Sequence, residues 1–197
     1  MITGWIPLYV RSRGVLLALL AALAVIAGIW LLAAEHGAID ERLAVITTGA
    51  AMMLAGPTLG TFDQALESTA AMPWPPRRAL HLILFALLIA AVLAGIGYAP
   101  GWVVLRNCLG LAGLVGIGAA LVGVRYGWVP ALLWTAPQAL FHSQGGPVPQ
   151  QVLFWLDQPA ASTAAIVTAA VLFGLGVSFY ARRGGPPVSA AESALPS

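Results

Sequence analysis

The three histidines are the side chains of this chain best suited to binding a metal ion. His36, His81 and His142 fall at the ends of long apolar stretches. His36 and His142 could meet at one membrane surface, where Glu35 or Asp157 would complete a zinc site. The alternative is that all three are ordinary histidines of a membrane interface. Because they are scattered singly, the second interpretation is favoured, and we expect no metal site.

Other catalytic arrangements are missing from the sequence. Cys108 is the single cysteine, which excludes a CxxC motif and an intrachain disulfide. The chain contains no GxSxG nucleophile elbow and no HExxH zinc motif. It also contains no lysine, so neither a P-loop lysine nor a pyridoxal Schiff base can form. We expect neither enzymatic activity nor a cofactor bound by this chain itself.

The composition is that of an integral membrane protein. Hydrophobic residues make up 60% and charged residues 8% of the chain, with a mean hydropathy of +0.90. Soluble domains carry about 25% charged residues. The net charge of +2 says little about partners. We expect a lipid bilayer as the surrounding medium and no nucleic acid.

Apolar runs predict an all-α fold with six transmembrane helices in a single domain of residues 1–180. A spanning helix needs about 20 apolar residues. The expected spans are residues 14–34, 43–59, 79–98, 107–124, 127–141 and 161–180. The fifth is short and contains two prolines, Pro130 and Pro137. Residues 181–197 have the composition of a disordered tail.

The positions of the arginines predict that both termini lie in the cytoplasm. Short cytoplasmic loops collect Arg and Lys. With the N-terminus inside, the inner segments hold Arg11, Arg13, Arg77, Arg78, Arg125, Arg182 and Arg183, and the outer ones hold Arg42 and Arg106. The opposite orientation would reverse this asymmetry.

Three of the expected spans carry stripes of small residues at every fourth position. The second span carries Thr47, Ala51 and Ala55, the fourth carries Ala112, Gly116 and Ala120, and the sixth carries Ala170, Gly174 and Ser178. Such stripes let helix backbones approach closely in lipid. They either pack the chain against itself or contact a second membrane subunit, and we take those of the fourth and sixth spans as candidate contacts for such a subunit. No acidic residue or arginine is expected near the middle of a span, which disfavours an ion-coupled transporter.

Two connecting segments are unusual. Between the fifth and sixth spans, a loop rich in Gly and Pro contains the apolar residues Leu153, Phe154 and Trp155. We expect a short element there that either lies in the membrane interface or enters the membrane and returns. Between the second and third spans, "TFDQALESTAAM" predicts a short polar helix from residue 61 to 72.

That short helix carries a like-charged pair four residues apart. Asp63 and Glu67 share one face, and Phe62 and Leu66 lie on a neighbouring one. Carboxylates at this spacing mildly oppose an isolated helix. A cationic partner surface would explain them, and the alternative is a solvated loop helix.

These features together resemble an ABC-2-type exporter permease. The pieces "LESTAAMPWPPRRALHLILF" and "LRNCLGLAGL" followed by "GWVPAL" look like small membrane subunits that work with ABC ATPases in bacteria. The resemblance implies that residues 62–71 form a coupling helix that contacts a cytosolic ATPase, and that residues 2–12 form an interfacial elbow helix. It also implies a bacterial cytoplasmic membrane, a second permease chain, a hydrophobic or amphipathic substrate, and ATP and Mg²⁺ bound by the partner. The alternative is a non-transporting accessory protein of another membrane complex.

The arginine asymmetry can be tested with single cysteines in a Cys108→Ser background. We expect Arg77→Cys and Arg183→Cys to escape an impermeant thiol reagent in intact cells, because they face the cytoplasm. His36→Cys and Gln150→Cys should react with it. Permeabilised cells, in which all four positions should react, are the control. The reverse labelling pattern in intact cells would overturn the orientation.

Overall fold

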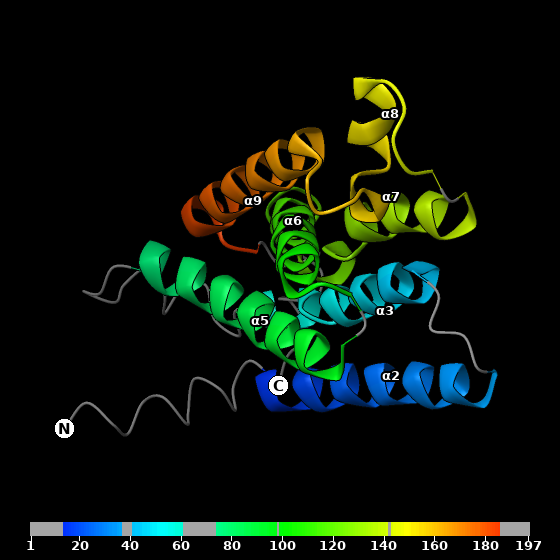
Figure 1. Ribbon diagram of the computed structural model, residues 1–197. Helices are drawn as coiled ribbons and strands as arrows, with labels where there is room; N and C mark the ends of the chain where they lie inside the picture. The colour runs from blue at the N-terminus through cyan, green and yellow to red at the C-terminus, as the bar shows by residue number, and fades with distance from the viewer. Residues whose placement is uncertain (1–13, 37–40, 61–73, 98, 142, 186–197) are drawn as a thin grey trace.

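The computed structural model describes residues 14–36, 41–60, 74–97, 99–141 and 143–185 of the chain. Within these ranges every regular element is an α-helix or a 3₁₀-helix (Figure 1). The expected elbow at residues 2–12 lies outside the described residues.

Five helices are long and apolar enough to cross a membrane, as far as the described residues extend. They are α2 (Val15–His36), α3 (Glu41–Met53) continued by η1 (Gly56–Leu59), α5 (Trp74–Ile96), α6 (Gly101–Leu121) and α9 (Thr163–Arg183). The protein is therefore an all-helical, multi-pass membrane protein. Prolines and glycines set several of the boundaries. Two prolines lie in the first turn of α5, where a missing N–H costs nothing, and Gly184 ends α9 with a φ of +67°.

The remaining helices are short. They are η2 (Val124–Tyr126), α7 (Val129–Leu140), α8 (Val148–Leu153) and η3 (Trp155–Asp157). The expected fifth span coincides with α7, whose 12 residues rise about 18 Å. That length is less than the roughly 30 Å of a hydrocarbon core. By itself α7 is too short to count as a full span.

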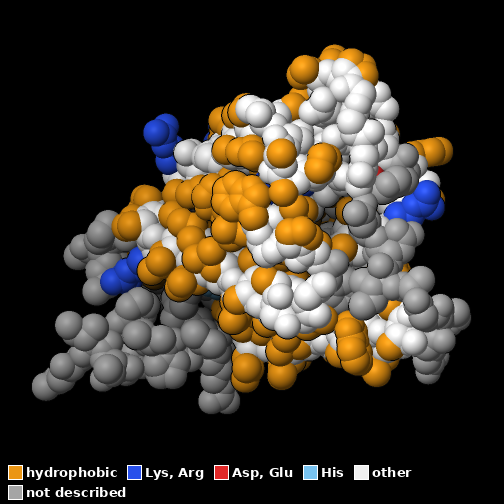
Figure 2. Space-filling view, viewed as in Figure 1, with side chains coloured by type: hydrophobic (Ala, Val, Ile, Leu, Met, Phe, Trp, Pro, Cys, Tyr) orange, Lys and Arg blue, Asp and Glu red, His pale blue; other side chains and the backbone are white. Residues whose placement is uncertain are grey.

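Helix α6 is the centre of the bundle. In Figure 1 it is foreshortened and lies between the other helices. In its most apolar stretch 78% of the residues are buried, compared with 11% for α2. The α2 helix accordingly lies at the periphery and exposes large side chains such as Leu16, Leu17 and Leu31. Figure 2 shows apolar side chains spread over the described part of this face, as expected for a surface in contact with lipid.

The contact between α6 and α9 is made by backbone on backbone. A Cβ atom on Gly113 would overlap the Leu172 carbonyl, and one on Gly176 would overlap Gly113. A Cβ on Gly116 would lie 3.0 Å from the Gly176 carbonyl oxygen. Because residue numbers on both helices rise together along this contact, α6 and α9 run parallel.

A parallel pair requires the intervening chain to return to the end of the bundle where α6 began. Helix α7 makes part of this return. It runs antiparallel to α3, because Gly49 contacts Thr135 while Gly56 lies near Trp128. Gly127, just before α7, packs on Ala119 near the end of α6. The chain therefore turns back immediately after α6.

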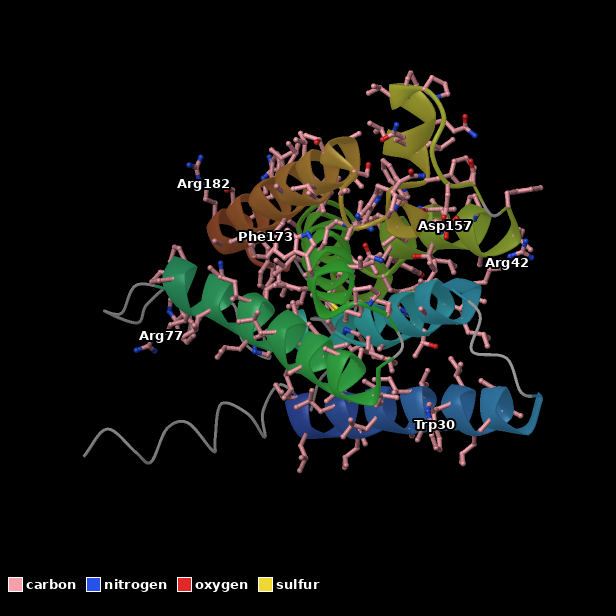
Figure 3. The ribbon with its side chains drawn as sticks, viewed as in Figure 1. Trp30, Arg42, Arg77, Asp157, Phe173 and Arg182 are labelled. Carbon is pink, nitrogen blue, oxygen red and sulfur yellow. The ribbon has the colours of Figure 1, made fainter. Side chains whose placement is uncertain are left out.

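Charged side chains gather at the two ends of the bundle. Figure 3 shows Arg77 and Arg182 at the left end, and Arg42 and Asp157 at the right. Arg77 is at the start of α5 and Arg182 at the end of α9, so the helix directions agree with the picture. Arg42 thus lies at the opposite end of the bundle from Arg77 and Arg182, as the sequence grouped them.

Several boundaries differ from the sequence-based expectation, and helix α5, for example, begins at Trp74 and not at residue 79. Helix α6 begins at Gly101 after Pro100, so Arg106 lies inside the helix and not in an outer loop, where the sequence analysis placed it. Helix α9 continues to Arg183, and the following Gly184 and Gly185 are buried. The expected disordered tail therefore cannot begin at residue 181, and its part from 186 onward lies outside the described residues.

The glycine contact can be tested by a matched pair of substitutions on α9. Gly176→Ala should destabilise the protein by about 1–3 kcal/mol, because its methyl group would force the two backbones apart. Gly174→Ala, two residues away, should be neutral or stabilising by up to about 1 kcal/mol, because a Cβ there meets nothing within 4 Å. Unfolding by SDS from mixed micelles measures both. Equal stabilities for the two variants would contradict the close packing of α6 on α9.

Candidate functional site

The residues proposed to contact an ATPase lie outside the described part of the chain. Phe62, Asp63, Leu66 and Glu67 fall within residues 61–73, of which nothing structural is described. The structure does describe both ends of this connection, Gly60 and Trp74. The expected coupling helix therefore stays a prediction.

The small-residue stripes on α6 and α9 have different environments. Ala112, Gly116 and Ala120 on α6 are buried within the chain. They pack the bundle against itself, which is the alternative to a subunit contact that the sequence left open. Ala170, Gly174 and Ser178 on α9 are exposed. The α9 stripe is thus the one with an accessible surface.

The apolar run after α8 enters the interior. Leu153 is 55% exposed, Phe154 is half-buried and Trp155 is fully buried. The indole ring of Trp155 lies against Gly110, midway along α6, where even a Cβ would overlap it. This burial is inside the protein and does not place the segment relative to a membrane, so the re-entrant or interfacial element stays a prediction.

A buried arginine holds the chain that follows Trp155. Arg106 is only 3% exposed. Its guanidinium group donates to the Gln158 carbonyl oxygen at 2.8 Å and to the Pro159 carbonyl oxygen at 3.1 Å, while its Nε donates to Asn107 Oδ1 at 3.1 Å. Charge-assisted hydrogen bonds of this kind are stronger than neutral ones. The N–H groups of the Arg106 guanidinium therefore hold the backbone of residues 158–159 against α6.

Two amide side chains hold the same segment from both sides. The Asn107 side-chain amide donates to the Leu156 carbonyl oxygen at 2.8 Å. The Leu156 N–H donates to Gln138 Oε1 of α7 at 2.9 Å. These bonds satisfy backbone groups of an irregular segment, which is tolerated at membrane depth only when its polar groups find partners. We call residues 155–159 the wedge.

The loop before α8 is tied to the end of the wedge. The Ser143 N–H donates to Asp157 Oδ2, and the Gly145 N–H donates to Gln158 Oε1, both at 2.9 Å. Gln158 also donates to the Ser143 carbonyl oxygen at 2.7 Å. Asp157 and Gln158 are both buried. The wedge and its loop therefore form one network at the end of the bundle where α6 begins.

A second polar cluster lies at the opposite end and joins three helices. Thr58 Oγ1 of η1 lies 3.0 Å from His81 Nε2 of α5, and the Tyr180 hydroxyl of α9 donates to the Leu59 carbonyl oxygen at 2.8 Å. The Thr58 hydroxyl proton is donated to the Ala55 carbonyl oxygen. The Thr58 hydroxyl thus bridges the chain just after α3 and the His81 ring of α5. We call Thr58, Leu59, His81 and Tyr180 the anchor.

Sequence reasoning missed most of this chemistry. Arg106 was counted as a loop residue, His81 was assigned to a membrane interface, and the amides of Asn107, Gln138 and Gln158 were not singled out. A usable signal was the density of amide and carboxylate groups between residues 138 and 158, around an apolar run. No group of three or more metal-binding side chains occurs among the residues that the structure describes.

Comparison with family models, curated proteins and solved structures finds no match to this chain.

The role of Arg106 can be tested by hydrogen exchange. Arg106→Ala leaves the Gln158 and Pro159 carbonyls without their donors, and each unsatisfied buried group costs about 1–3 kcal/mol. We expect peptides covering residues 150–160 to exchange at least about tenfold faster, with peptides of α5 unchanged. Arg125→Ala, which removes an exposed arginine of η2, is the control. Unchanged exchange in Arg106→Ala would show that the wedge is held by other contacts.

Proposed function

We propose that this chain is the membrane subunit of an ABC-2-type exporter in a bacterial cytoplasmic membrane. A separate cytosolic ATPase would bind and hydrolyse ATP with Mg²⁺, and a second permease chain would complete the path. The chain itself performs no chemistry. The cargo would be hydrophobic or amphipathic, because the faces exposed by the described helices are largely apolar.

This proposal includes six membrane crossings with both termini in the cytoplasm. The parallel alignment of α6 and α9 supports an even number of crossings, because the chain must return between them. Helix α7 and the residues around it would make the fifth crossing. The wedge would then be a re-entrant element that covers the part of the bundle that α7 leaves open.

The observation that carries the proposal is the position of the anchor. It joins η1, α5 and α9 directly beside the connection of residues 61–73. Gly60 follows η1, and α5 begins at Trp74, so both ends of the connection enter helices that belong to the anchor. A force applied to this connection by an ATPase would therefore reach three helices at once. A loop without a mechanical role needs no such attachment.

The exposed face of α9 supports the presence of a second permease chain. Val167, Val171 and Leu175 are about half-exposed there, beside the small residues Ala170 and Gly174. Small residues at this spacing permit close helix approach, and the flanking valines and leucine provide packing area. The face suits another transmembrane helix.

Charge reversal in the connection tests the ATPase contact. Asp63→Arg with Glu67→Arg should release a co-expressed ABC ATPase encoded beside this chain, because like charges at an interface cost several kcal/mol. Co-purification and ATP-dependent export measure the effect. The matched control is Gln64→Arg with Ser68→Arg, which adds two cations at the same spacing on another face of the expected helix.

The two double variants give a clear decision. Loss of the ATPase in the first and its retention in the control support the coupling helix. If the reversed variant keeps its ATPase and exports normally, the connection is not the coupling element. A non-transporting accessory role would then be the better explanation of the chain.

A further inference from the structure

Arginines gather at the end of the bundle where α5 begins and α9 ends. A Cβ on Gly184, just after α9, would lie 2.7 Å from the central carbon of the Arg78 guanidinium, and one on Gly185 would overlap the Val124 side chain of η2. The start of α5, η2 and the end of α9 therefore meet at these two glycines. Their arginines form what we call the arginine cluster: Arg77, Arg78, Arg125, Arg182 and Arg183.

The acidic residues of the described helices lie at the opposite end of the bundle (Figures 1 and 3). They are Glu35 near the end of α2, Glu41 at the start of α3, and Asp157. In the whole sequence, the segments expected on the side of the cluster hold seven arginines against three acidic residues, Asp63, Glu67 and Glu192. That side keeps a surplus of four positive charges, seven minus three, even if each acid pairs with an arginine.

The two arginines at the end of α9 face the surroundings. Arg182 and Arg183 are both exposed. The Arg183 guanidinium lies over the Phe179 ring, 5.9 Å from its centre. A contact with a ring uses the face of the planar guanidinium group, whereas its N–H donors lie around the edge. Those edge donors are suited to paired hydrogen bonds with phosphate oxygens.

Aromatic rings accompany other arginines of the cluster. The Arg77 guanidinium lies over the Trp74 ring at 5.7 Å, and that of Arg125 over the Tyr126 ring at 5.9 Å. Trp and Tyr are enriched where a membrane meets water, at the level of the lipid head groups. Long arginine side chains near helix ends extend to the same level. In a bilayer, the cluster would therefore lie beside the phosphate groups of one leaflet.

A column of exposed leucines runs along α5 from the cluster toward the middle of the helix. Leu80, Leu84, Leu87 and Leu88 follow Arg77 at helical spacing, so they share its face. They are between 43% and 55% exposed. Figure 2 shows apolar side chains between the two arginines at the left of the view, which Figure 3 labels Arg77 and Arg182. This surface is thus positive at one end and apolar along its length.

We propose that this surface binds an anionic phospholipid of the phosphatidylglycerol type. The phosphodiester would accept hydrogen bonds from Arg182 and Arg183, and an acyl chain would lie along the leucine column of α5. Charge complementarity selects this occupant, because the ammonium group of a zwitterionic lipid would be repelled by the surplus of arginines. A soluble acidic partner would leave the leucine column uncovered. The site holds whether or not an ATPase binds this chain.

Two lipids with the same acyl chains and different head groups test the site. They are palmitoyl-oleoyl phosphatidylglycerol (POPG) and palmitoyl-oleoyl phosphatidylcholine (POPC), each titrated into the purified protein in detergent, with bound lipid counted by native mass spectrometry. Each arginine near a membrane surface contributes about fivefold to the binding of anionic lipid, so the first POPG should bind at least about tenfold tighter than POPC. Glycerophosphoglycerol, the POPG head group without acyl chains, should not compete, because it lacks the apolar contacts.

Variants locate the binding. Arg182→Gln with Arg183→Gln should weaken POPG at least about tenfold and leave POPC unchanged, because two charges are removed. Arg182→Lys with Arg183→Lys keeps the charge but loses the paired donors, and should cost about threefold. The matched single variants are Arg183→Gln and Arg42→Gln, which each remove one exposed arginine from opposite ends of the bundle. The first should weaken POPG about fivefold and the second should not.

Four results would overturn the proposal. Equal affinities for POPG and POPC would show that the surface does not select charge. Equal losses in Arg183→Gln and Arg42→Gln would show a response to net charge alone. Competition by glycerophosphoglycerol would indicate a phosphate site without a lipid chain. Unchanged POPG binding in the double glutamine variant would remove the arginines of α9 from the site, and loss of a co-purified ATPase from that variant would assign them to a protein contact.

Discussion

The close approach of α6 and α9 is the constraint on which the other contacts depend. Their backbones meet at Gly113 and Gly176, where no side chain fits between them. In a bilayer, helices gain little from burying apolar surface, so dispersion contacts between closely packed backbones hold them together. Since the pair is parallel, the alignment of its residues places the start of α9, and hence the wedge before it, beside the first half of α6. It also brings Tyr180 to the end of η1.

The buried Arg106 follows from this arrangement. A wedge of irregular backbone inside the bundle presents carbonyl groups that no helix can satisfy, and each would be costly without a donor. One guanidinium group supplies several N–H donors in a plane and remains charged, which makes it suited to a cluster of carbonyls. Arg106 therefore solves a local problem of backbone satisfaction. Its burial is explained by structure and needs no transported ion.

What the sequence could predict was limited by the range of the interactions. Long apolar helices depend on local composition, and the main helices were found for that reason. The predicted location of Arg106 in a loop was wrong because its partners, Gln158 and Pro159, lie 52 and 53 residues further along the chain.

The stripe on α9 illustrates a second limit of prediction from sequence. Gly174 and Gly176 are equally small, and only the rotation of α9 on α6 decides which is buried. The shortness of α7 was visible in the sequence, whereas its return beside α3 was not.

The same contact also relates the two polar clusters at opposite ends of the bundle. Tyr180 of the anchor and the residues that follow the wedge belong to the two ends of one helix, α9, which is fixed to α6 by backbone contact. A shift of η1 and α5 at the anchor would therefore move α9 together with α6, because sliding would carry larger residues into the positions where only Gly113 and Gly176 fit. Helix α2, which is little buried, has no such restriction. In an exporter of the proposed kind, motion at the connection of residues 61–73 would thus move the α6–α9 pair and its wedge as one unit. The peripheral α2 would be free to move relative to that unit.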